Sequence, residues 1–184
     1  MPTRQLMLTQ IKCHTETDED GNDSPYLMVF MGLRSTNPGV PASGKLIRLR
    51  DADWDGAFQS GTKKDMRWIL SEAEAGGFFV FATLVEEDWD PDLPSGGFLQ
   101  TMVLTQWMLY GGPTWANLTS TQLQQIMRGK MATLLQASLA NDEYIQTRSF
   151  VVPLVTVETA LTPLNFSGDG GSYSVTFTVR IKGG

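Results

Sequence analysis

The sequence predicts a mainly β protein: an antiparallel β-sandwich with one amphipathic helix inserted near residues 121–140. Several short segments alternate between apolar and polar residues or form apolar runs, and turn-forming residues separate them. One long stretch instead has apolar residues at helical spacing. The order of the elements lacks the regular strand and helix alternation of a parallel sheet. We therefore expect a single domain that covers residues 1–184.

The first half of the chain contains four candidate strands. Residues 6–14 and 45–50 alternate in part, as half-exposed strands do, whereas residues 26–33 and 78–85 are apolar almost throughout. The most apolar of the four, residues 78–85, is predicted to be a central strand, because both faces of a central strand can be buried. The sequence STNPGVPASG, which consists of turn-forming residues, separates the second strand from the third.

The helical region follows. Residues 99–110 fit a helix and a strand equally well, and the sequence Gly111-Gly112-Pro113 ends this element in either case. The clearest helix begins at a cap formed by Thr119 or Ser120. Its apolar face contains Leu123, Ile126, Met127, Met131, Leu134, Leu135 and Leu139. An apolar stripe of this kind is typical of a helix packed on a sheet, and binding to a partner is the less common alternative.

The last part of the chain returns to β structure. Residues 149–157 and 173–181 are predicted to be strands, and the glycine-rich sequence at 168–171 forms a turn before the second of them. Pro153 lies inside the first of these strands and has no backbone N–H to donate. We therefore expect an edge strand or a bulge there.

Composition excludes several functions. The formal net charge is −6 and no basic run is longer than Lys63-Lys64, so nucleic acid is not an expected partner. Cys13 and His14 are too few ligands for a structural zinc site, and neighbours on a strand point to opposite faces, which disfavours a catalytic pair. The sequence also has no G-x-S-x-G motif and no phosphate-binding glycine loop. We expect a protein that is not an enzyme.

Acidic residues are concentrated in three short segments, which hold 13 of the 20 acidic residues and no Lys or Arg. The segments are residues 16–23 (ETDEDGND), 51–55 (DADWD) and 86–92 (EEDWDPD). Each lies at the end of a predicted strand, and the loops of a sandwich gather at its two ends. Crowded carboxylates repel each other, and either solvation or a cation relieves the repulsion. Because oxygen ligands suit Ca²⁺, calcium is the predicted cofactor, and solvated loops are the alternative.

The candidate site residues come from these segments. The candidate metal ligands are Asp18, Asp20, Asp23, Asp88, Asp90 and Asp92, with Asp51, Asp53 and Asp55 as possible additional ligands. Two tryptophans, Trp54 and Trp89, each stand between two aspartates. These tryptophans are candidates for contact with a membrane or a protein partner. Alternatively, they fold back as a lid over the end of the sandwich.

Two of the segments have sequences typical of a known family. Residues 18–27 (DEDGNDSPYL) are similar to the pattern D-x-x-G-x-S-D-P-Y-V, and residues 81–96 are similar to a strand followed by D-x-D and then D-x-x-G. Together they resemble the signatures of C2-type domains, which are calcium-dependent, phospholipid-binding β-sandwiches. The resemblance implies that Asp18 and Asp23 with Asp88, Asp90 and Asp92 bind calcium at a sandwich tip that contacts anionic lipid. Compared with the family pattern, the Ser and the Asp are exchanged at Asp23 and Ser24.

Two hypotheses about function follow. The first is a non-enzymatic calcium-binding module that attaches to a membrane or a protein partner through its acidic loops. The second is a structural subunit of a filament, particle or toxin-like complex that self-assembles without metal; abundant Met and Trp would supply its contacts with its own copies. The first residues lack the apolar core of a signal peptide, so we expect a cytoplasmic protein, with leaderless export as the alternative.

Overall fold

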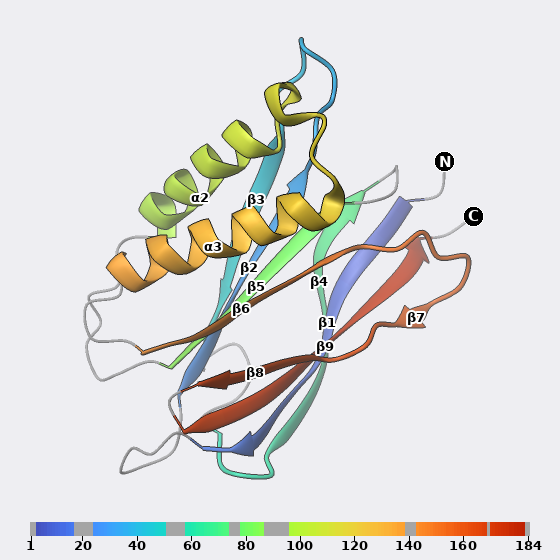
Figure 1. Ribbon diagram of the computed structural model, residues 1–184. Helices are drawn as coiled ribbons and strands as arrows, with labels where there is room; N and C mark the ends of the chain where they lie inside the picture. Colours follow the sequence, from blue (N-terminus) through green and yellow to red (C-terminus); the bar gives the residue numbers. More distant parts are fainter. Residues whose placement is uncertain are drawn as a thin grey trace.

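The computed structural model describes residues 3–16, 24–50, 58–73, 78–86, 96–138, 143–168 and 170–182. Within these ranges nine strands form two antiparallel sheets, and two helices lie against one of the sheets (Figure 1). The predicted β-sandwich with an inserted helix is confirmed.

The larger sheet has the order β4-β1-β9-β7, with β8 also paired to β9. Its strands are β1 (Thr3–Thr15), β4 (Lys63–Ala73), β7 (Thr159–Ala160), β8 (Leu164–Gly168) and β9 (Gly171–Lys182). The smaller sheet has the order β3-β2-β5-β6. Its strands are β2 (Pro25–Leu33), β3 (Ser43–Leu49), β5 (Phe79–Glu86) and β6 (Glu143–Val151).

The helices form a third layer on the smaller sheet, on the side away from the larger sheet (Figure 1). They are α2 (Gly96–Tyr110) and α3 (Ser120–Ser138), joined through the short helix η1 (Pro113–Trp115). The ambiguous residues 99–110 are therefore helical, and α3 is the predicted inserted helix. No helix in the described part of the chain is both long enough and apolar enough to cross a membrane.

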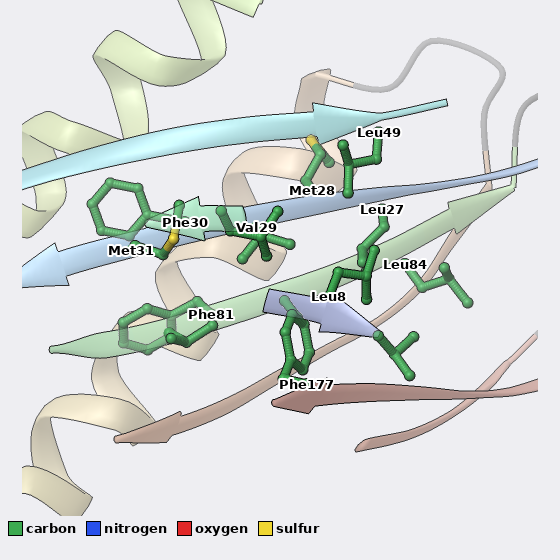
Figure 2. Packing of buried hydrophobic residues seen from close by; sticks show 14 of the residues in the cluster. Leu8, Leu27, Met28, Val29, Phe30, Met31, Leu49, Phe81, Leu84 and Phe177 are labelled. Atoms are coloured by element: carbon green, nitrogen blue, oxygen red, sulfur yellow. The ribbon is translucent and has the colours of Figure 1, made fainter. Parts of the chain in front are cut away.

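Three layers explain why β2 and β5 are apolar on both faces. All eight residues of β5 are buried, as are the first eight of β2. Leu27 and Leu84 lie in one core cluster with Leu8 and Phe177 of the larger sheet (Figure 2). The opposite faces of β2 and β5 meet the helices. The predicted central position of residues 78–85 is confirmed, because β5 lies between β2 and β6.

Trp107 fixes the helix layer to the sheet. Its indole ring is fully buried, with the rings of Phe30, Phe79 and Phe81 at centroid distances of 5.8, 5.4 and 6.0 Å. Its Nε1 donates a hydrogen bond to the backbone oxygen of Leu33 at 3.2 Å, which supplies the partner that a buried indole needs. One side chain thus anchors α2 on β2 and β5.

The sequence of α3 contains its own start signal. Thr119 Oγ1 accepts a hydrogen bond from the backbone N of Gln122 at 3.2 Å, and Gln122 Oε1 accepts one from the backbone N of Thr119 at 2.9 Å. This reciprocal pair is a capping box and confirms Thr119 as the helix cap. Four residues of the predicted apolar stripe are buried: Leu123, Met127, Met131 and Leu135. Ile126 and Leu134 are half-buried, and Leu139 lies outside the described residues.

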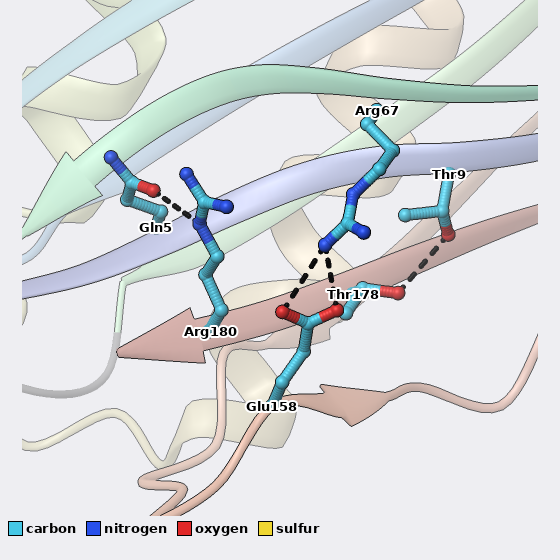
Figure 3. Close-up of polar contacts among 6 residues, drawn as sticks. All are labelled: Gln5, Thr9, Arg67, Glu158, Thr178 and Arg180. Carbon is cyan, nitrogen blue, oxygen red and sulfur yellow. Dashed lines mark hydrogen bonds and ion pairs between the residues drawn. The ribbon is translucent and has the colours of Figure 1, made fainter. Parts of the chain in front are cut away.

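The outer face of the larger sheet is held by polar contacts (Figure 3). Arg180 Nε donates to Gln5 Oε1 at 2.6 Å, linking β9 to β1. The hydroxyl groups of Thr9 and Thr178 are 3.1 Å apart across the same two strands. Arg67 on β4 forms an ion pair with Glu158 at 2.9 Å. This face is mainly polar but not fully exposed, because Gln5 is 2% and Thr178 is 6% exposed.

Two expectations about strands need correction. The strand predicted at 149–157 is wrong over most of its length, because β6 spans Glu143–Val151 and residues 152–158 belong to no strand. β6 is an edge strand and ends two residues before Pro153, which cannot continue the ladder. The strand β4 was not expected from the sequence. Its exposed residues Lys63, Asp65 and Arg67 alternate with half-buried ones, but the next exposed residue, Ile69, is apolar and weakens the pattern.

Candidate functional site

The register of the smaller sheet brings three strand ends together. Pro25, the first residue of β2, pairs with Glu86, the last residue of β5. Leu27 pairs with Leu49, the last residue of β3. The chain therefore enters β2 and leaves β3 and β5 at one end of this sheet, which we call the acidic end. The acidic segments 16–23, 51–55 and 86–92 all connect to the sheet there.

The candidate ligands and contact residues themselves are not described by the structure. Those outside the described residues are Asp18, Asp20, Asp23, Asp51, Asp53, Trp54, Asp55, Asp88, Trp89, Asp90 and Asp92. Their assignment as metal ligands or partner contacts therefore stays a prediction. The structure shows where the described chain ends on either side of them.

Glu86 is a buried carboxylate at the acidic end. Its side chain is 2% exposed, and its Oε1 accepts a hydrogen bond from the backbone N of Ser24 at 3.2 Å. This bond ties the residue before β2 to the last residue of β5. A buried carboxylate is costly without compensating charge or hydrogen bonds. Glu86 thus places a further carboxyl group beneath the point where two acidic segments meet the sheet.

Basic side chains also lie near the acidic end. Arg48, the residue before the last one of β3, has its guanidinium carbon 5.9 Å from the centre of the Tyr26 ring. Arg50 directly follows β3 and precedes the second acidic segment. These two arginines can neutralise part of the acidic charge, so they offer a second way to relieve repulsion besides a metal ion.

Two other carboxylates are held by partners of their own, both on β4. Gln10 at 2.9 Å and Lys63 at 3.1 Å lower the pKa of Asp65 below its usual value, because both favour the charged form. Hydrogen bonds from Lys182 and Gln5 lower the pKa of Glu72 in the same way. These carboxylates pair strands within the larger sheet, and they serve as controls for the acidic segments.

Cys13 and His14 point to opposite faces of β1, as expected for neighbours on a strand. Cys13 is fully buried, whereas His14 is exposed and its Nε2 lies 2.9 Å from Ser174 Oγ. Among the described residues, no group of three or more His, Cys, Asp and Glu side chains could hold a metal ion.

An open groove on the helix layer was missed by the sequence analysis. It has a volume of about 500 Å³ and lies where the end of α2, η1 and the middle of α3 meet. We call it the helix groove. Its lining includes Tyr110, Trp115, Gln125, Ile126, Gly129 and Lys130. Two signals in the sequence could have indicated it: residues 96–138 contain no Asp or Glu, and Gly129 interrupts a strong helix pattern.

Comparisons with known proteins give no family. No family model matches the chain, and no curated protein matches it. Among solved structures it is similar to human GIVD cytosolic phospholipase A2, solved with methyl gamma-linolenyl fluorophosphonate inhibitor and terbium chloride. The match has a TM-score of 0.35 and 10% identity, and it covers 98% of this chain but 18% of the other. A match this weak carries no argument about function.

Proposed function

We propose that the protein is a non-enzymatic β-sandwich module that binds calcium through its acidic segments and attaches by them to a membrane or a protein partner. The observation that carries the proposal is the strand register. By pairing Pro25 with Glu86 and Leu27 with Leu49, it connects three acidic segments to one end of one sheet.

The donor chemistry of these segments fits calcium. Their acidic side chains supply only oxygen ligands, and Ca²⁺ takes six to eight oxygens in flexible geometry. The residues that would hold the ion are Asp18, Asp20 and Asp23 of the first segment with Asp88, Asp90 and Asp92 of the third. The second segment adds Asp51, Asp53 and Asp55 as further candidates. A bound ion would supply positive charge at this end of the sandwich.

Thermal melting tests this proposal. Ca²⁺ at about 100 times its Kd stabilises a folded protein by about 2.7 kcal/mol, which raises the Tm of a chain of this size by roughly 5–10 °C. We expect this rise with Ca²⁺ relative to chelator, and a smaller one with Mg²⁺ at the same concentration. The double variant Asp88→Asn/Asp90→Asn should abolish the rise.

The control for this experiment is Asp65→Asn. It removes one carboxylate from β4, where Gln10 and Lys63 hold it, and should leave the calcium effect intact. An equal rise with Mg²⁺ and Ca²⁺ would indicate charge screening alone. A Tm that Ca²⁺ does not change would refute the calcium site.

A structural or assembly subunit is the second candidate function, and the outer surface of α2 favours it. Phe98, Met108 and Leu109 are exposed on this helix, which has no charged residue. The hydroxyl groups of Thr101 and Thr105 donate to backbone oxygens one turn earlier, at 2.8 Å each. An uncharged, largely apolar outer helix surface is typical of a contact surface.

A further inference from the structure

We propose that the helix groove binds the Asp-Trp-Asp sequence of a second copy of this chain, so that copies associate head to tail. The proposal gives the assembly role a specific contact, and it does not depend on calcium. Four properties of the groove support it: its rings, its floor, its charge and its position.

The groove presents two aromatic rings on a fixed wall. Tyr110 and Trp115 lie 5.6 Å apart between ring centres, and Trp115 is 37% exposed. Arg34 holds this wall by donating to the backbone oxygens of Trp115 at 2.7 Å and Leu118 at 2.8 Å. Aromatic side chains in a fixed position give contact area at low cost in conformational entropy. The wall therefore suits a flat apolar group such as an indole ring.

Gly129 opens the floor of the groove. A Cβ atom placed at Gly129 would meet nothing within 4 Å, so packing inside the chain does not require glycine there. Glycine in the middle of a helix is nevertheless less stable than alanine. Its absent side chain lets an outside group approach the backbone of α3 closely. This is the property expected of the floor of a binding groove.

Charge selects the occupant. Residues 96–138 contain Arg128 and Lys130 and no acidic residue, although the whole chain has a net charge of −6. Lys130 Nζ lies 5.8 Å from the centre of the Tyr110 ring, at the groove. An aromatic group with carboxylates on both sides complements this surface. The chain contains that chemistry twice, as Asp53-Trp54-Asp55 and Asp88-Trp89-Asp90.

Position favours a second copy over the same chain. The groove wall is clamped by Arg34 at the far end of β2, whereas the acidic segments connect at Pro25. A nine-residue strand separates these ends by about 25–30 Å. Trp89 is three residues beyond Glu86, and an extended chain of that length reaches about 11 Å. A contact between unlike ends of two copies continues into a ring or a filament.

A peptide titration and sedimentation, both in chelator, test the proposal. The probe is the peptide EEDWDPD, residues 86–92, and its control is EEDADPD. We expect the first peptide to bind the full chain and to dissociate its oligomers, and the second to do neither. Gly129→Ala places a methyl group in the groove, and Lys130→Met removes the positive charge that would pair with the carboxylates of the peptide. Each should weaken peptide binding and self-association by about tenfold or more.

Controls separate binding from folding. Gly129→Ala should raise the Tm by about 2–4 °C while it weakens binding, a combination that a folding defect cannot produce. Lys45→Met removes the same charge as Lys130→Met from an exposed position on β3 and should leave binding unchanged.

Three results would overturn the proposal. These are no binding at millimolar peptide, binding that the groove variants do not change, and a strict monomer at high protein concentration. If the protein stayed a strict monomer but still bound the peptide, the groove would take a tryptophan from the same chain or from another protein. Because calcium is absent throughout, failure here is distinct from failure of the calcium site.

Discussion

The space around the backbone determines whether a position in this fold requires glycine. Gly32 on β2 and Gly97 at the start of α2 are both glycine, yet their surroundings differ. A Cβ atom at Gly32 would lie 2.4 Å from Cε2 of Trp107, whereas one at Gly97 would meet nothing within 4 Å. The Trp107 ring cannot retreat easily, because three phenylalanine rings and the Leu33 backbone oxygen hold it. Gly32 is therefore required by close packing.

Substitution of these two glycines should have opposite effects. Gly32→Ala forces an extra methyl group into a filled core, and we expect the free energy of unfolding to fall by about 1–3 kcal/mol. Gly97→Ala improves helix propensity in open space and should raise it by up to about 1 kcal/mol. Urea unfolding followed by circular dichroism measures both. Equal stability of Gly32→Ala and the parent protein would contradict the packing of Trp107 described above.

At the scale of elements, how well the sequence predicts a helix or strand depends on which of its faces are buried. The sequence of α3 predicts its type and its start, because one face is apolar and a capping pair stands before it. The helix α2 could not be told from a strand, because its exposed surface is also apolar and no stripe stands out. β4 was missed because the exposed residue Ile69 is apolar and interrupts the alternation. β6 was misplaced because apolar residues continue in the chain after the strand ends at Val151. The spacing of apolar residues along the sequence indicates the type of an element only when one face of that element is exposed to water and polar.

The start of α3 gives a test at this scale. Thr119→Ala removes the side chain that accepts the hydrogen bond from Gln122 N, and we expect a loss of about 1 kcal/mol in the free energy of unfolding. The matched control is Thr121→Ala, which lies in the first turn, is exposed and replaces the same residue type. It should be neutral or slightly stabilising, because alanine is the better helix former. If both variants lost the same stability, the capping box would not be the cause.

At the scale of the whole molecule, charge is divided between two parts. The acidic segments connect at one end of the smaller sheet, and the helix layer contains basic residues without acidic ones. The sequence alone shows that acidic residues are concentrated, but their common end requires the pairing of Pro25 with Glu86 and of Leu27 with Leu49. The helix groove could not be predicted either, since Tyr110, Trp115 and Lys130 meet only when α2, η1 and α3 are packed.

The central claim is that acidic segments far apart in the sequence bind calcium together. Calcium titration calorimetry tests it on four proteins: the parent, Asp18→Asn/Asp23→Asn, Asp88→Asn/Asp90→Asn, and the combination of all four substitutions. If the segments share ions, each pair should weaken calcium binding by about tenfold or more, and the combined loss should be smaller than the sum of the two. Absence of saturable binding in the parent protein, or losses from the two pairs that simply add, would contradict the claim.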